Sequence, residues 1–175
     1  MVRALLPLAA LALTLPTEAQ AGEWFAAMLA QGTVRPLSQD IGDRGAALQL
    51  GWRSQRVAAL APIGAPSAHA FGSLNTRGGT DFIAGGLSWR LGGRVYLRPG
   101  IGLALHNGRL PGREAGWRPA SLGSRLLFEP ELAVGLGTGP VTVELAWVHL
   151  SHATIFAAEN AGLDMLGLRV NLRLR

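Results

Sequence analysis

The C-terminal part of the chain contains VTVELAWVHLS, residues 141–151, and, after a polar loop, LDMLGLRVNLRLR, residues 163–175. In both segments apolar residues alternate with polar or small ones, and side chains alternate across a strand with period two. The pattern therefore predicts two neighbouring strands, each with one apolar face. The apolar face of the first continues into His149 and Ser151, and Asp164 shares the parity of the apolar positions in the second. Three polar side chains thus interrupt an apolar surface.

The start of the chain has the features of a secretory signal peptide. Arg3 precedes an apolar run over residues 4–15, and an A-x-A sequence follows at residues 19–21. Such a run is too short to cross a membrane as a helix. We expect removal of residues 1–21, leaving one exported domain over residues 22–175. The alternative is that the run is retained as an anchor helix.

Composition narrows the class of protein. The chain is 49% hydrophobic and 15% charged, has 24 glycines and lacks cysteine, which removes disulfides, thiolate chemistry and cysteine-based metal sites. No second long apolar run is present, which excludes a helical membrane bundle. The net charge is +5, and all basic residues are arginine. Because export argues against a nucleic-acid partner, the predicted partners are anionic lipid headgroups. Alternatively, several of these arginines are buried counter-ions.

Alternation recurs along the whole mature chain. The eight predicted strands cover approximately residues 23–33, 46–53, 69–77, 81–91, 95–106, 125–136, 141–151 and 163–175. Short glycine-rich turns alternate with longer polar loops. Segments of roughly ten residues with this pattern are typical of transmembrane β-barrels. The sequence therefore predicts an all-β fold, an eight-stranded antiparallel transmembrane β-barrel.

The non-apolar face of these strands favours a barrel with its apolar side outward. That face is rich in glycine and alanine, which fits the narrow lumen of an eight-stranded barrel. It also carries charges of both signs that we expect to pair across the lumen. The charged residues are Glu129, Glu131, Glu144, Arg90, Arg98, Arg125, Arg169 and Arg173. The alternative is a soluble, lipocalin-like barrel with an apolar interior that binds a lipid.

Strand parity then predicts where the three polar residues lie. Short turns of outer-membrane barrels are periplasmic and long loops extracellular. The strand that leaves the turn at residues 137–140 runs outward, so His149 and Ser151 are expected near the extracellular end, facing outer-leaflet lipid. Asp164 opens the returning strand at the same level. The tryptophans Trp24, Trp52, Trp89 and Trp147 are expected to be interfacial anchors.

The combination of His149, Ser151 and Asp164 is that of a serine hydrolase. Residues i and i+2 of a strand lie roughly 6.5 to 7 Å apart on one face, and a histidine and a serine can lean together to hydrogen-bond. A carboxylate on the neighbouring strand can bind the other imidazole nitrogen and fix its tautomer. Polar groups on a lipid-facing surface cost free energy, which favours a functional role.

Four short motifs also resemble a known family. They are His149-Leu150-Ser151-His152-Ala153, Asn160-Ala161-Gly162-Leu163-Asp164, Gly167-Leu168-Arg169 and the upstream Leu122-Gly123-Ser124-Arg125. Together they resemble the C-terminal signature of the outer-membrane lipid A 3-O-deacylases, the PagL family. The resemblance lies in specific motifs over residues 122–175. Before residue 122 it is limited to the predicted barrel architecture. The chain differs from the family pattern in having histidine after the serine, Asp164 as the acid, a longer His-to-acid spacer and a terminal arginine.

The resemblance implies an exterior active site that hydrolyses the ester-linked 3-O-acyl chain of lipid A. It makes Ser151 the nucleophile, His149 the base and Asp164 the carboxylate. The oxyanion donors it implies are the backbone of His152 and Ala153 and the side chain of Asn160, although Asn160 could equally serve the turn at Gly162. His152 has inward parity, so a lumen or loop role is expected for its ring.

The predicted partners are therefore lipid A, or lipopolysaccharide, and outer-membrane lipids, at the bacterial cell outer membrane. No nucleic-acid partner, metal site or cofactor is expected, and the prediction allows a homodimer. Two other functions stay open from the sequence. One is a non-catalytic barrel that only stabilises the membrane, and the other is the soluble lipid-binding barrel.

Overall fold

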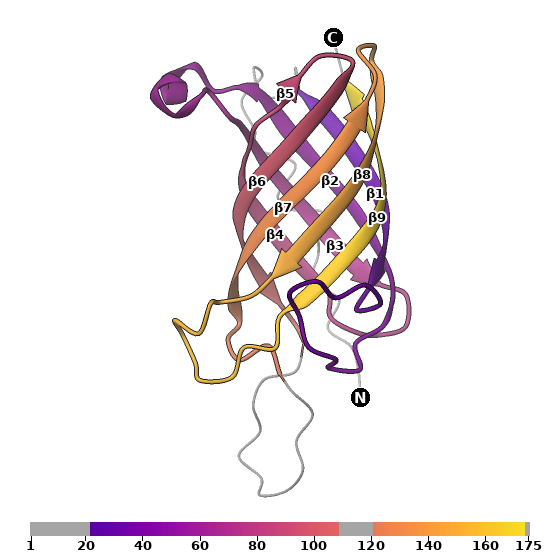
Figure 1. The fold of residues 1–175 in the computed structure, drawn as a ribbon, viewed down its shortest axis with the longest axis vertical. Helices are drawn as coiled ribbons and strands as arrows, with labels where there is room; N and C mark the ends of the chain where they lie inside the picture. The colour runs from indigo at the N-terminus through magenta and orange to yellow at the C-terminus, as the bar shows by residue number, and fades with distance from the viewer. Residues whose placement is uncertain (1–21, 109–120, 174–175) are drawn as a thin grey trace, which may run out of the picture.

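The protein is a closed antiparallel β-barrel (Figure 1). The computed structural model describes residues 22–108 and 121–173, so the predicted signal peptide lies outside the described residues. The strands are β1 (Glu23–Gln31), β2 (Gly45–Arg56), β3 (Ser67–Asn75), β4 (Phe82–Ser88), β5 (Leu91–Gly92), β6 (Val95–His106), β7 (Leu126–Leu136), β8 (Val141–Leu150) and β9 (Leu163–Arg173). β1 pairs with β9, and β4 pairs with β6 to close the sheet. Because β5 is a two-residue addition beside β6, eight longer strands in the described ranges form the wall, as predicted.

Some strand ends differ from those expected. The third strand covers Ser67–Asn75 instead of residues 69–77. It ends early because Oδ1 of Asn75 accepts the backbone N–H groups of Arg77 and Gly79 at 2.8 and 3.1 Å, which turns the chain. The predicted strand over residues 81–91 ends at Ser88, and the chain resumes pairing only in β5. Alternation in the sequence continues to Leu91 in the second of these segments, so it could not reveal the end of β4.

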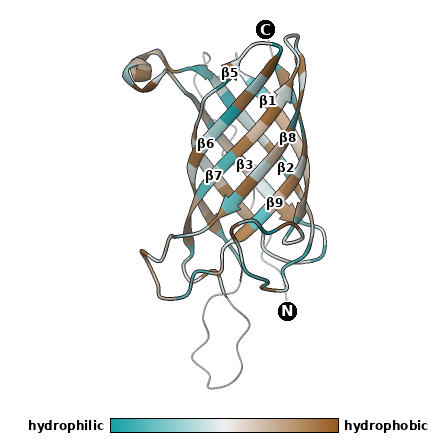
Figure 2. Cartoon of the chain, in the orientation of Figure 1, coloured by the Kyte–Doolittle hydropathy of each residue, from teal (hydrophilic) through white to brown (hydrophobic). Residues whose placement is uncertain are grey.

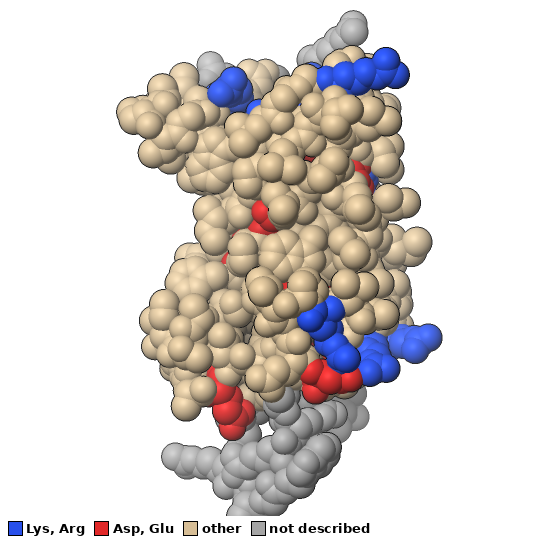
Figure 3. All heavy atoms as spheres, viewed as in Figure 1, with Lys and Arg blue, Asp and Glu red and all other residues tan. Residues whose placement is uncertain are grey.

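The outward face of the wall is apolar. In Figure 2 hydrophobic and hydrophilic positions follow one another along the strands. Large hydrophobic side chains are exposed at every second position of the strands. They include Met28, Leu48, Leu50, Leu74, Ile83, Leu97, Ile101, Leu103, Leu105, Leu132, Val134, Val143, Leu145, Leu168 and Val170. In the face shown in Figure 3, the exposed charged side chains gather towards the two ends of the barrel. No helix in the described part of the chain is long and apolar enough to cross a membrane.

The lumen contains buried apolar side chains, among them Phe25, Leu29 and Phe71, and a network of buried ion pairs. The main members of the network are Arg53, Arg98, Arg169, Glu23, Glu131 and Glu144, all buried. Nη2 of Arg169 lies 2.8 Å from Oε2 of Glu131, and Nε of Arg98 lies 2.7 Å from Oε1 of Glu144. The alternative of a soluble, lipocalin-like barrel requires an apolar cavity for a lipid, and the buried charges and the exposed apolar wall favour the membrane barrel instead.

Three of the arginines predicted to pair across the lumen do not form ion pairs among the described residues. Arg90 lies over the ring of Tyr96 and donates to the carbonyl of Gly137 at 2.8 Å. Arg125 donates to the carbonyl of Gly108 at 2.7 Å, and Arg173 is exposed at the strand end. These residues sit close to strand ends, where backbone carbonyls and solvent are available as partners. Arg53, which the sequence did not single out, takes part in the buried network instead.

The two ends of the barrel differ. One end has the turn at residues 137–140, and there the first residue of β1 pairs with the last of β9, Glu23 with Arg173. We call it the short-turn end. The other end, the long-loop end, has the described connections over residues 32–44, 76–81 and 151–162. The ends of β8 and the start of β9 lie there, with His149 and Asp164.

The buried network makes a prediction about stability. We expect Arg169→Met to lower the free energy of unfolding by about 3–5 kcal/mol, because it leaves Glu131 and Glu144 buried with less compensating charge. Urea unfolding of the purified barrel in detergent micelles, followed by tryptophan fluorescence, measures this. Arg94→Met is the matched control, since Arg94 is exposed in a turn. A wild-type urea midpoint for Arg169→Met would contradict the role given to the network.

Candidate active site

His149 and Asp164 are paired across two neighbouring strands at the long-loop end. They are register partners in the antiparallel pairing of β8 with β9, so their side chains leave the sheet on the same face. That face is the outward one, because it also carries the exposed Val143 and Leu145. Nδ1 of His149 lies 2.8 Å from Oδ1 of Asp164, within hydrogen-bond distance.

The carboxylate of Asp164 has four donors. Besides His149, the indole Nε1 of Trp147 donates to Oδ1 at 3.0 Å. The backbone N–H groups of Leu37 and Ser38 donate to Oδ2 at 2.9 and 2.8 Å. A carboxylate has about four acceptor sites, so the hydrogen-bonding capacity of Asp164 is filled. Its orientation is therefore fixed by donors from two separate segments of the chain, β8 and residues 37–38.

The loop over residues 32–44, here called the cover loop, lies across this pair. The N–H of Gln39 donates to the carbonyl of Ala161 at 2.8 Å, which ties the cover loop to the loop before β9. Asp40 binds Arg35 and Arg44 within the cover loop. The hydrogen bond from Arg35 holds the pKa of the Asp40 carboxyl well below its usual range. These contacts give the loop a defined shape.

The cover loop changes one expectation. His149 and Asp164 were expected to face lipid directly, but His149 is 6% exposed and Asp164 is 0% exposed. Both side chains point away from the lumen, as expected, but other parts of the protein cover them. A carboxylate in contact with hydrocarbon would be costly, and the amides of Leu37 and Ser38 replace lipid with hydrogen-bond donors.

The imidazole of His149 is held on both sides. The ring of Trp147 stacks against it with a centroid distance of 5.8 Å and an interplanar angle of 21°. Gly162 lies at its other edge: a Cβ built there would come within 2.9 Å of Cε1 and 3.4 Å of Nε2. Gly162 also has a φ of +67°, which favours glycine. Space and backbone conformation both require glycine beside the ring.

Ser151 lies at the end of the same strand face. Its N–H and carbonyl exchange hydrogen bonds with Phe128 of β7 at 3.1 and 2.7 Å, which fixes its backbone. The side chain is partly exposed, unlike that of His149. Among the described residues the Ser151 hydroxyl forms no hydrogen bond with the ring, although the sequence led us to expect one. Catalytic hydrogen bonds are often long in the absence of substrate.

The residues expected to donate to an oxyanion form a tight turn after Ser151. The N–H of Ile155 donates to the carbonyl of His152 at 2.9 Å. The two central residues, Ala153 and Thr154, have φ values of +51° and +58°, as in a type I′ turn. The N–H of His152 already donates to Oδ1 of Asn160 at 3.2 Å. Within the described ranges, the Ala153 N–H has no protein acceptor.

The ring of His152 has a structural role in this loop, as its inward parity suggested. Its Nε2 lies 2.8 Å from the carbonyl of Glu159, and it is fully buried. Gly123 closes over it, since a Cβ at that position would meet Nε2 at 2.4 Å. Ser121 adds a further tie, accepting the N–H of Ala161 on its carbonyl at 3.1 Å. The segment before β7 thus supports the loop that carries the turn.

Sequence reasoning missed several contributors to the site. Trp147 was expected to be an interfacial anchor, and the signal that could have indicated its role is its parity, two residues before His149. Leu37 and Ser38 act through backbone amides, which leave no signal in residue type. Gly162 was considered as a turn residue and as part of a family motif, and not as a neighbour of the His149 ring. The described residues contain no group of three or more His, Cys, Asp or Glu side chains placed to hold a metal ion.

Comparison with known proteins agrees with this architecture. The family model for lipid A 3-O-deacylase (PagL) matches residues 38–173. The solved structure titled "Crystal structure of the outer membrane enzyme PagL" superposes with a TM-score of 0.61 at 20% identity, covering 87% of this chain and 99% of that one. A search of curated proteins found no match. With the family model spanning most of an outward-apolar barrel, the chain belongs to the lipid A 3-O-deacylase (PagL) family of outer-membrane hydrolases.

Proposed function

We propose that this protein is a serine esterase that removes the 3-O-acyl chain of lipid A, with Ser151 as nucleophile, His149 as general base and Asp164 as the orienting carboxylate. The observation that carries the proposal is the 2.8 Å contact between Nδ1 of His149 and Oδ1 of Asp164. Both residues occupy outward-facing positions of β8 and β9. The family membership supports lipid A as the substrate.

The contacts of Asp164 support the role of His149 as a base. A carboxylate accepts hydrogen bonds, so the imidazole nitrogen beside it, Nδ1, is the one that carries the proton. Nε2 is then unprotonated and can accept the proton of Ser151. The indole of Trp147 stacks on the His149 imidazole, which restricts rotation of the imidazole and so holds Nε2 in one direction. Because Asp164 is filled with donors, it stays oriented when the imidazole becomes positively charged.

The reaction then follows in two steps. Oγ of Ser151 attacks the acyl carbonyl while Nε2 of His149 takes its proton. The tetrahedral intermediate collapses, the bond between the acyl carbon and the 3-oxygen of the sugar breaks, and His149 gives its proton to that oxygen, which leaves as the 3-hydroxyl group. A water molecule, deprotonated by His149, hydrolyses the acyl-serine and releases the fatty acid.

The turn after the nucleophile supports a site for the developing negative charge. We assign the oxyanion to the N–H of Ala153 and the side-chain amide of Asn160, whose Oδ1 is bound to His152 and whose Nδ2 can therefore donate elsewhere. The His152 N–H is the third candidate and would have to leave Asn160 to take part. One such donor contributes about 3 kcal/mol to transition-state stabilisation.

Apolar side chains around Ser151 support an acylated substrate. Leu37 of the cover loop and Ile155 and Phe156 of the loop after β8 are exposed at this end of the barrel. The ring of Phe156 stacks on Phe128, the backbone partner of Ser151, with centroids 6.0 Å apart. An acyl chain can therefore lie against apolar surface while its ester reaches the serine.

The first test removes the nucleophile. Ser151→Ala should lower deacylation by about a thousandfold or more, because only binding and oxyanion contacts remain. Mass spectrometry of lipid A from cells producing each variant measures the lost 3-O-acyl chain. Ser54→Ala is the matched control, at the short-turn end in β2, and should retain wild-type activity. Equal lipid A profiles with and without the wild-type protein would instead indicate a non-catalytic barrel.

The second test addresses the carboxylate. Asp164→Asn should reduce the turnover rate about 10⁴-fold while the barrel still folds, because the amide no longer selects the Nδ1–H tautomer of His149. Purified enzyme acting on lipid A in mixed micelles gives the rate. Heat-dependent migration on gels, a property of folded barrels, serves as the folding control. A folded Asp164→Asn variant with nearly full activity would remove Asp164 from the mechanism.

The third test addresses the packing of the base. Gly162→Ala places a methyl group 2.9 Å from Cε1 of His149 and should cut activity about 10- to 100-fold by displacing the ring. Gly139→Ala is the comparison, since a Cβ there meets no atom within 4 Å. Steady-state rates of both purified variants decide the matter. If the two substitutions have equal effects, the ring of His149 does not depend on Gly162.

A further inference from the structure

An apolar arm projects sideways from the short-turn end of the barrel. It comprises residues 57–65 between β2 and β3 and contains the short helix η3 (Ala58–Ile63), whose residues include none that is buried. Its sequence, VAALAPIGA, has no charged and no polar side chain. In Figure 1 the arm extends away from the wall at the upper left, and in Figure 2 its helix is brown.

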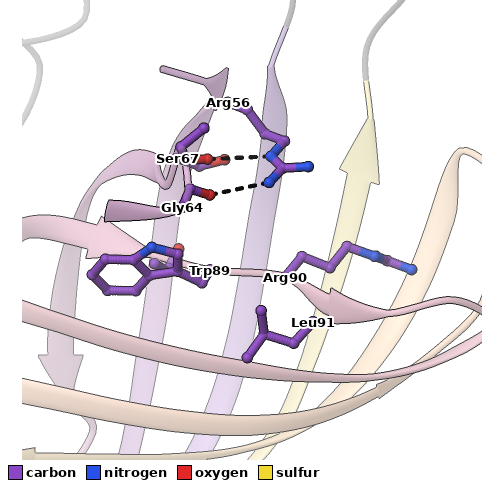
Figure 4. A pocket seen from close by; sticks show the side chains of 8 residues that line it. Arg56, Gly64, Ser67, Trp89, Arg90 and Leu91 are labelled. Carbon is purple, nitrogen blue, oxygen red and sulfur yellow. Dashed lines mark hydrogen bonds between the residues drawn. The ribbon is translucent and has the colours of Figure 1, made fainter. Parts of the chain in front are cut away.

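The arm is fixed to the barrel at its base. Nε and Nη2 of Arg56 donate to the carbonyls of Ala65 and Gly64 at 3.2 and 3.0 Å. Nε1 of Trp89 donates to the carbonyl of Ile63 at 2.7 Å. Figure 4 shows Arg56 and Trp89 on either side of Gly64. These hydrogen bonds fix the direction in which the arm projects, so the fold itself keeps the apolar side chains of the arm exposed.

The arm continues the apolar outer surface of the barrel. Trp89 donates to the carbonyl of Ile63, and Trp89, Arg90 and Leu91 line the hollow between the arm and the wall (Figure 4). Leu91 and Val95 are exposed on the outward face at this end. Trp24 is also exposed there, and tryptophan is enriched where a membrane meets water. Apolar side chains of the wall thus lie next to the arm, with Arg56 and Arg90 lining the hollow between them.

We propose that the arm, residues 57–65, is an interfacial anchor that lies among the phospholipids of the periplasmic leaflet. Short turns of outer-membrane barrels face the periplasm, which places the arm at that leaflet. Exposed Ile63 and its neighbours favour transfer out of water. A protein-binding patch usually has a polar rim with hydrogen-bonding groups, and the arm offers no polar side chain for one. Arg56 at its base suits lipid phosphate.

The absence of cysteine makes a direct test possible. Single cysteines are introduced by Ile63→Cys in the arm, by Leu145→Cys in the lipid-facing wall and by Thr138→Cys in the exposed turn at the same end. Each is labelled with an environment-sensitive fluorophore, and the folded barrel is placed in nanodiscs of phosphatidylethanolamine and phosphatidylglycerol. Quenching is measured with lipids brominated on the acyl chain and with aqueous iodide.

The proposal requires the Ile63 probe to behave like the Leu145 probe, losing fluorescence to brominated lipid and little to iodide. The Thr138 probe should show the reverse pattern, which controls for position at the short-turn end. If the Ile63 probe is quenched by iodide as strongly as the Thr138 probe, the arm is in water and the proposal fails. Protection from both quenchers would show that a second copy covers the arm, which also overturns it.

Discussion

Hydrocarbon around the wall offers no hydrogen-bond partner, and this constraint governs the rest of the structure. The backbone meets it by closing the sheet through β4 and β6. Charged side chains meet it by turning inward, where Arg53, Arg98 and Arg169 find glutamates. The apolar side chains are then left to face lipid. The outer face is therefore apolar, unlike that of a soluble barrel, and the interior holds the charges beside buried apolar side chains.

The same constraint explains the construction of the candidate site. A carboxylate on the outward face has no lipid partner, and Asp164 is satisfied by protein donors from two segments, β8 and the cover loop. His149 is enclosed with it, and Ser151 keeps partial access at the strand end. The His149–Asp164 pair is therefore held in a fixed position under protein, while Ser151 is left partly exposed. A polar group on this face needs its own local cover, and the cover loop supplies it.

The sequence was informative where structure follows from alternation. It predicted the barrel, the direction of its faces and the pairing level of His149 and Asp164, since all three depend on strand parity. It could not predict the ends of β3 and β4, because turns there are made by single side-chain contacts such as those of Asn75. It also missed Trp147 and the amides of Leu37 and Ser38. Their contacts join residues distant in sequence, and backbone donors have no signature in residue type.

The cover loop also has a consequence for the timing of assembly. Leu37 lies 127 positions before Asp164, whose carboxylate it supports, and β9 is the last strand to be made and pairs with β1. Asp164 can be held correctly only after the two ends of the chain have met. On the proposed mechanism, a chain still in transit through the periplasm carries an incomplete catalytic group. Hydrolysis would then begin only in a finished barrel, so export intermediates would not attack lipids before insertion.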